Sequence, residues 1–226
     1  QLYPQLATDW KISSDAKTLT LSLRKGVKFH DGTDFNAAAV KWNMEKRKAA
    51  KLGDYEEVTS IAIIDDYTIQ LNFSGFRNTS LVTLWFTGGQ IYSPTAYERN
   101  GKDWAMWNAV GTGPFKFVDY QKDQLLKTTR FDGYWERGKP YLDAYNIHYI
   151  TDITTTALTF LSGELDEVSN LDAAEASNLM QKGYKNQSVP NVIGVLYPDS
   201  VNADSPFAKQ KVREAIEYAL DRVGIA

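Results

Sequence analysis

Apolar and polar residues alternate in two places in the first third of the chain, and each place predicts a β-hairpin. In residues 18–23 three leucines alternate with threonine and serine, the period of a strand that buries one face. Residues 10–12 are the expected partner strand, because a turn-rich segment separates the two. Residues 58–64 and 67–73 carry apolar side chains on both sides of two aspartates, which predicts a second hairpin.

Helical spacing and capping residues predict the helices. Asn36 is suited to cap a helix that continues through alanines to about Ala50. The pattern restarts after Asn108, so we expect a mixed α/β chain with a boundary near residues 104–111. Further helices are expected at residues 79–86, 94–100, 154–161, 173–182 and 209–220, and further strands at residues 115–120, 124–131, 145–150 and 192–196.

Composition narrows the function classes. The net charge is −3 and no stripe of lysine and arginine stands out, which argues against a nucleic-acid partner. Cysteine is absent, so disulfides and thiolate metal sites are excluded.

Apolar residues at helical spacing near the C-terminus, such as Val212, Ile216 and Leu220, leave a helix with an apolar face to cover. We therefore expect the sequence to be a fragment of a longer protein.

The sequence offers few candidates for catalysis. His30 and Asp31 form a local acid–base pair, but the favoured interpretation is a surface turn in which Asp31 caps the bend at Gly32. Glu164 and Asp166 would share one face of a strand, as a pair of carboxylates in a glycosidase could, whereas a helix C-cap explains them better. We expect no catalytic residue, no metal and no cofactor, and keep a carbohydrate-active enzyme as the alternative from another class.

Two further features are ambiguous on their own. The glycines of residues 111–113 could suggest a phosphate-binding loop, but Pro114 removes a backbone donor and a strand, not a helix, follows. Aromatic residues in the middle of the chain could stack on a sugar, line a peptide groove, or pack a junction between two lobes. They are Trp104, Trp107, Tyr134, Trp135 and Tyr141.

Several short strings follow one another in an order that resembles a known family. They are residues 4–10 (PQLATDW), 23–33 (LRKGVKFHDGT), 111–115 (GTGPF), 134–135 (YW), 163–166 (GELD), 205–207 (SPF) and 212–222. Together they resemble the extracellular solute-binding proteins of bacterial peptide/nickel ABC importers, solute-binding family 5. Asp9 departs from the family's pattern, in which a serine is usual.

The resemblance implies an α/β fold, namely a periplasmic-binding-protein-like (class II) lobe fragment with an inserted small α+β domain. Residues 1–108 would be the inserted domain and residues 109–226 part of the first lobe, with the second lobe absent. The implied function is capture of peptides outside the cytoplasmic membrane and delivery to an ABC permease, without catalysis. The full-length protein would be a monomer in the periplasm, or a lipoprotein held at the cell surface by a lipid anchor.

The resemblance also implies where ligand would be contacted. The expected ligand-binding residues are Gly88, Gly89, Gln90, Ser169, Asn170, Leu171, Asn191 and Leu196. Nickel-binding relatives use an arginine near the position of Gln90, and its absence here weighs against a nickel chelate. Oligosaccharide and nickel chelate remain the alternative ligands within the family.

Overall fold

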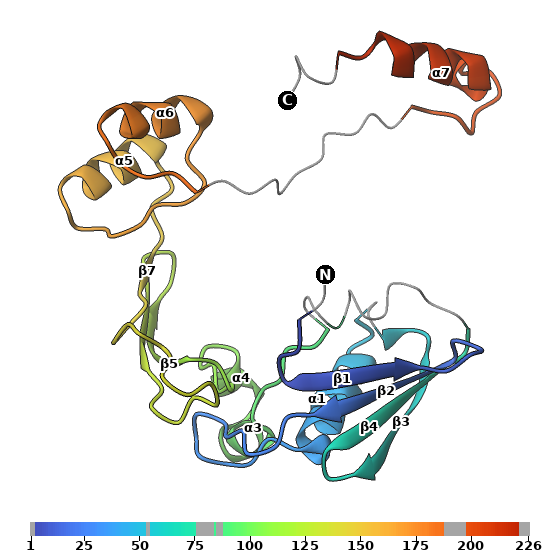
Figure 1. The fold of residues 1–226 in the computed structure, drawn as a ribbon, viewed down its shortest axis with the longest axis vertical. Coiled ribbons are helices and arrows are strands. Elements are labelled where there is room, and N and C mark those ends of the chain that lie inside the picture. The colour runs from blue at the N-terminus through green and yellow to red at the C-terminus, as the bar shows by residue number, and fades with distance from the viewer. Residues whose placement is uncertain (1–2, 53–54, 76–83, 85–87, 188–197, 222–226) are drawn as a thin grey trace. The chain divides into compact units, whose positions relative to one another are not determined.

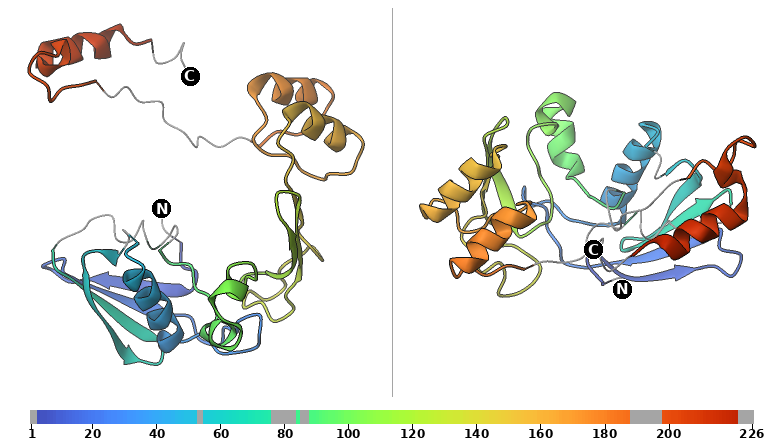
Figure 2. Two further views of the ribbon diagram at one scale, coloured as in Figure 1. Left: turned by 180° about the vertical axis from the view of Figure 1, so that it is seen from behind. Right: turned by 90° about the horizontal axis from the view of Figure 1, so that it is seen from above.

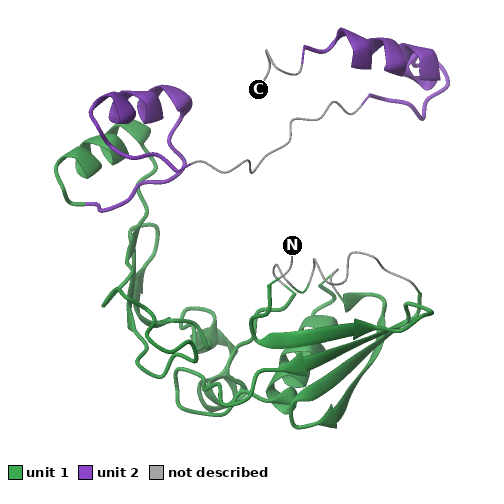
Figure 3. Cartoon of the chain, viewed as in Figure 1, with its two compact units in different colours: residues 1–164 green, residues 165–226 purple. Residues whose placement is uncertain are grey.

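The chain forms two compact units, residues 1–164 and residues 165–226 (Figure 3). The expected boundary between residues 108 and 109 lies within the first unit and stays a prediction. The computed structural model describes residues 3–52, 55–75, 84, 88–187 and 198–221.

The first unit begins with a four-stranded antiparallel sheet in the order β1-β2-β4-β3 (Figure 1). Its strands are β1 (Ala7–Ile12), β2 (Thr18–Leu23), β3 (Val58–Asp65) and β4 (Thr68–Phe73). Both predicted hairpins are confirmed. β1 starts three residues earlier than predicted, because its pairing shifts register between Ala7 and Asp9 and its exposure does not alternate along the strand.

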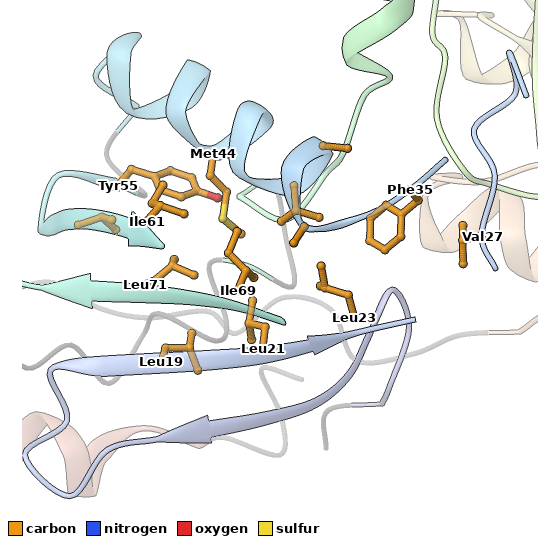
Figure 4. Close-up of a cluster of buried hydrophobic side chains, with 14 of the residues drawn as sticks. Leu19, Leu21, Leu23, Val27, Phe35, Met44, Tyr55, Ile61, Ile69 and Leu71 are labelled. Carbon is orange, nitrogen blue, oxygen red and sulfur yellow. The ribbon is translucent and has the colours of Figure 1, made fainter. Parts of the chain in front are cut away.

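Helix α1 (Ala37–Ala49) lies against one face of this sheet (Figures 2 and 4). The side chain of Asn36 accepts a hydrogen bond from the backbone N–H of Ala39 at 3.0 Å, so the predicted cap is confirmed. The leucines of β2 and alternate residues of β4 point toward α1 and form the core. Removing this apolar surface from water is the main force that holds helix and sheet together.

The rest of the first unit contains a three-stranded antiparallel sheet in the order β5-β6-β7. Strand β7 is shorter than the predicted 145–150, because the side chain of Thr128 replaces ladder bonds there. Its hydroxyl accepts from the N–H of Tyr145 at 3.1 Å and donates to the carbonyl of Tyr145 at 2.5 Å. The elements are α3 (Pro94–Asn100), α4 (Lys102–Ala105), β5 (Phe115–Gln121), β6 (Leu125–Arg130), β7 (Ile147–His148) and α5 (Ile153–Leu161).

The second unit contains α6 (Ala173–Gln181), the 3₁₀ turn η2 (Pro206–Ala208) and α7 (Gln210–Ala219). Asp172 caps α6 by accepting from the N–H of Glu175 at 2.8 Å. The predicted strand at 192–196 and nearly all of the predicted helix at 79–86 lie outside the described residues. Within the described part of the chain, no helix has the length and apolar character needed to cross a membrane.

Candidate ligand-binding region

Gly88, Gly89 and Gln90 form a turn whose backbone contacts Tyr55 and Leu84. The hydroxyl of Tyr55, which is 1% exposed, donates to the carbonyl oxygen of Gly88 at 2.6 Å. A Cβ atom on Gly89 would overlap the carbonyl oxygen of Leu84, so only glycine fits there. The next side chain, Gln90, is exposed to solvent. The turn therefore presents one polar side chain on a backbone held by these two contacts.

Asn43 on α1 secures the chain that follows this turn. Its Nδ2 donates to the carbonyl oxygens of Ala39 at 2.9 Å and Tyr92 at 2.8 Å, and its Oδ1 accepts from the N–H of Tyr92 at 2.9 Å. The side chain is only 6% exposed, and these bonds satisfy its amide. Sequence reasoning missed Asn43. The available signal was a polar residue between the core positions Val40 and Met44.

Ser93 links the same segment to two others. Its N–H donates to the carbonyl oxygen of Val110 at 2.9 Å, and its hydroxyl caps α3 by accepting from the N–H of Ala96 at 3.1 Å. The hydroxyl also donates to Oδ2 of Asp31 at 2.5 Å. Because Ser93 is fully buried, these contacts form part of the interior of the first unit.

Asp31 caps its own turn, as predicted, and also joins this cluster. Its Oδ1 accepts from the N–H of Thr33 at 3.0 Å and from the hydroxyl of Thr33 at 2.6 Å. Burial raises the pKa of the Asp31 carboxyl, but the hydrogen bonds from Ser93 and Thr33 outweigh it and leave the pKa below its ordinary value. Asp31 is thus held as a carboxylate in a structural role.

An apolar pocket of about 270 Å³ lies beside the turn. Gly89 and Ile91 form part of its wall, and the rest comes mainly from the sheet, from α1 and from residues near the start of the chain. This wall includes Leu6, Trp10, Leu23, Phe35, Val40 and Met44. Such a pocket can take an apolar group, while polar contacts would come from the backbone and from Gln90.

Ser169, Asn170 and Leu171 lie in the second unit, immediately before α6. Ser169 and Asn170 are exposed and Leu171 is half-buried. Asn170 has a φ of 61°, a left-handed conformation that asparagine tolerates better than most residues. The structure brings Gly88–Gln90 together as one turn and places residues 169–171 in a segment that bends at Asn170. Asn191 and Leu196 lie outside the described residues.

Of the two carboxylates considered for catalysis, Glu164 has a structural explanation. Gly163 has a φ of 82° and follows α5, and its N–H donates to the carbonyl of Phe160 at 3.0 Å. The N–H of Glu164 donates to the carbonyl of Thr159 at 3.2 Å. These two bonds form a Schellman motif, which confirms the predicted helix C-cap. Among the described residues, no group of three or more histidine, aspartate or glutamate side chains could hold a metal ion.

The other two ambiguous features also have structural roles. The N–H of Gly111 donates to Nδ1 of His30 at 3.3 Å, so a phosphate would have to compete for this donor. The guanidinium of Arg24 lies 4.2 Å from the ring centroid of Trp135, and Trp107 stacks on Tyr120 at 5.8 Å. Trp107 and Trp135 therefore pack against protein groups, whereas Tyr141 is 84% exposed.

Comparison with known proteins places the chain in a family. All of residues 1–226 match the family described as bacterial extracellular solute-binding proteins, family 5 Middle. The glutathione-binding protein GsiB of Salmonella choleraesuis (strain SC-B67) is 32% identical over 227 residues, which cover 96% of this chain and 43% of GsiB. The chain thus spans less than half the length of this relative.

Two solved structures share the fold at 32% sequence identity. An ABC transporter substrate-binding protein from Sinorhizobium meliloti has a TM-score of 0.74, with 82% of this chain and 39% of that chain covered. The periplasmic binding protein DppA from Helicobacter pylori, in complex with the peptide STSA, has a TM-score of 0.68, with 79% and 40% covered. The expected periplasmic-binding-protein-like α/β fold is confirmed, and the chain belongs to the family 5 extracellular solute-binding proteins of bacteria.

Proposed function

We propose that this chain is part of the substrate-binding component of an ABC importer, which captures peptides outside the cytoplasmic membrane and delivers them to the permease. The family match over all 226 residues carries this proposal. The relatives named for glutathione and the DppA complex with STSA support a peptide or peptide-like ligand. Neither capture nor release requires a bond to be made or broken, so we propose a binding protein without catalytic activity.

In this proposal the turn at Gly88, Gly89 and Gln90 is one ligand-contacting segment of the first unit. Its backbone is fixed by Tyr55 and its glycine cannot be replaced without overlap, features expected of a surface that must keep its shape. Residues 169–171, with Asn191 and Leu196, are the proposed contacts from the remainder of the chain. An extended peptide would gain affinity from backbone hydrogen bonds with few demands on side chains.

The proposed organisation follows the family resemblance. Residues 1–108 would form the inserted small domain and residues 109–226 part of the first lobe. The location is extracytoplasmic, either the periplasm or the cell surface by a lipid anchor, and the working form is a monomer that meets the permease.

A thermal-shift panel on the product of the complete reading frame tests the ligand class. Glutathione, dipeptides, tetrapeptides, a nickel–histidine chelate and oligosaccharides are added one at a time, each well above micromolar concentration. A ligand that binds only the folded state raises the Tm by mass action. We expect the shift with a peptide ligand, confirmed by calorimetric titration. If the Tm rises only with the oligosaccharides, or only with the nickel chelate, that ligand takes the place of the peptide in the proposal.

A metal chelate is in the panel because NikA from Brucella suis, whose structure holds Fe(III)-EDTA, has a TM-score of 0.67 at 26% identity. The alternative function, that of a carbohydrate-active enzyme, is tested separately by incubating the protein with chromogenic glycosides. Glycoside hydrolysis that disappears in Glu164→Gln would overturn the proposal of a binding protein without activity.

A further inference from the structure

His30 uses its backbone and both ring nitrogens to hold one short segment. Its N–H donates to the carbonyl oxygen of Gly111 at 2.9 Å, and its Nδ1 lies 3.3 Å from the N–H of Gly111. Its Nε2 lies 3.0 Å from the carbonyl oxygen of Gly113. These contacts join the loop between β2 and α1 to residues more than 80 positions later in the chain.

The two partners of the ring determine its protonation state. A backbone N–H can only donate, so Nδ1 of His30 must accept from Gly111. A carbonyl oxygen can only accept, so Nε2 must donate to Gly113. Only the neutral imidazole with its proton on Nε2 meets both requirements. A second proton, on Nδ1, would face the N–H of Gly111 and replace attraction by repulsion between two donors.

The surroundings of the ring include charges of both signs. Burial lowers the pKa of His30 most strongly, and the positive charge of Lys116 lowers it further. The hydrogen bond to Gly113 and the charge of Asp31 act in the opposite direction, but the pKa remains below its ordinary value. Phe131, the residue after β6, packs edge-on against the ring with centroids 5.0 Å apart.

Asp31 is limited as a counter-ion because its oxygens are already bonded. Ser93 donates to one of them and Thr33 to the other. A charged His30 would thus gain a modest attraction to Asp31 and lose its bond with the N–H of Gly111. The backbone bond from His30 to the carbonyl of Gly111 and the Nε2–H bond to the carbonyl of Gly113 persist in the charged state, so only the N–H of Gly111 is released.

We propose that one contact of His30 is sensitive to pH: the neutral ring accepts a hydrogen bond from the N–H of Gly111 through Nδ1, and the protonated ring cannot. Acid then releases the Gly111 N–H, while the bonds of His30 to the carbonyl oxygens of Gly111 and Gly113 remain. Residues 111–113 lead directly into β5, so the contact of His30 with Gly111 links the loop before α1 to the start of the three-stranded sheet. This inference rests on the hydrogen-bond geometry and not on the proposed function.

Nuclear magnetic resonance of the full chain tests this proposal. The sequence has only two histidines, so the signals of each imidazole can be assigned. His148→Gln leaves His30 as the only imidazole. Because His148 is exposed, this variant also serves as the reference in which the contacts of His30 are unchanged. In His148→Gln we expect the Nε2–H tautomer at pH 7.5. We also expect the exchange protection of the Gly111 amide, corrected for intrinsic rate, to fall as the pH drops below the ordinary pKa of imidazole, 6.5. The limiting slope is about tenfold per pH unit, and the fall ends below the lower folded-state pKa of His30.

His30→Gln supplies the matched comparison. Glutamine offers an N–H donor near the position of Nε2 and does not titrate, so protection at Gly111 should be weaker but constant between pH 7.5 and pH 5. An Nδ1–H tautomer at pH 7.5, or the same acid response in His30→Gln, would overturn the proposal. If His30→Gln does not fold, the tautomer and the Gly111 exchange in His148→Gln still decide it.

Discussion

Asn43 and Tyr92 are joined by two reciprocal hydrogen bonds, one from the amide of Asn43 to the carbonyl of Tyr92 and one from the N–H of Tyr92 to Oδ1 of Asn43. Through this pair, helix α1 holds the chain that follows Gly88, Gly89 and Gln90. A side chain 49 positions before Tyr92 therefore holds the segment that follows the proposed ligand-contacting turn.

Replacing Asn43 by alanine should destabilise the protein. The N–H and carbonyl of Tyr92 would lose their partner in a part-buried environment, which costs about 1–3 kcal/mol in the free energy of unfolding. Urea denaturation followed by circular dichroism measures the change. Asn186→Ala, at an exposed position, is the control and should lie within about 0.5 kcal/mol of the wild type. Equal stability of Asn43→Ala and the wild type would show that water or a shifted backbone replaces these bonds.

Gly89→Ala should be more harmful than Gly113→Ala. A Cβ on Gly89 overlaps the carbonyl oxygen of Leu84, so the backbone of the turn has to move. A Cβ on Gly113 meets no atom within 4 Å. We expect a loss of more than about 1 kcal/mol for Gly89→Ala and a smaller change for Gly113→Ala in thermal unfolding. The reverse order would contradict the tight packing of the turn.

Asp31 should contribute a recognisable part of the acid dependence of stability. Its carboxyl has a pKa below the ordinary 3.8, so its contribution is complete above that value and is lost as the pH falls through the lower folded-state pKa. Asp31→Asn should lower stability at pH 7 and flatten the dependence of the unfolding free energy on pH below 4. Asp199→Asn is a useful comparison, because Asp199 also has a lowered pKa but is fully exposed in the second unit. A slope in Asp31→Asn equal to that of the wild type would exclude this role.

Gln90→Ala should weaken ligand binding while leaving stability almost unchanged. The side chain is exposed, so if Gln90 contacts ligand as proposed, its loss removes a polar contact at a cost of about 1 kcal/mol, which corresponds to severalfold in Kd. Calorimetric titration of the complete protein with the peptide identified by thermal shift measures Kd, and the Tm without ligand is the control. Unchanged affinity would remove Gln90 from the proposed contacts. It would not affect the assignment of a peptide ligand.

Local sequence patterns determined most of the secondary structure of the described residues. Leucine alternation gave the boundaries of β2, and Asn36 and the C-cap at Gly163 marked helix ends, because capping and strand periodicity depend on residues a few positions apart. The shortened β7 could not be read this way. Its ladder is interrupted by Thr128, a residue from another strand.

The candidate site shows the same division. The order of short motifs was enough to indicate the family and the glycine turn, since both are written in contiguous residues. The tertiary structure alone decided that Tyr55 holds that turn, that Asn43 holds Tyr92 after it, and that His30 holds Gly111 and Gly113. These contacts join segments 33 to 83 positions apart. A hydrogen bond depends on distance and direction in space, and the folded chain sets both.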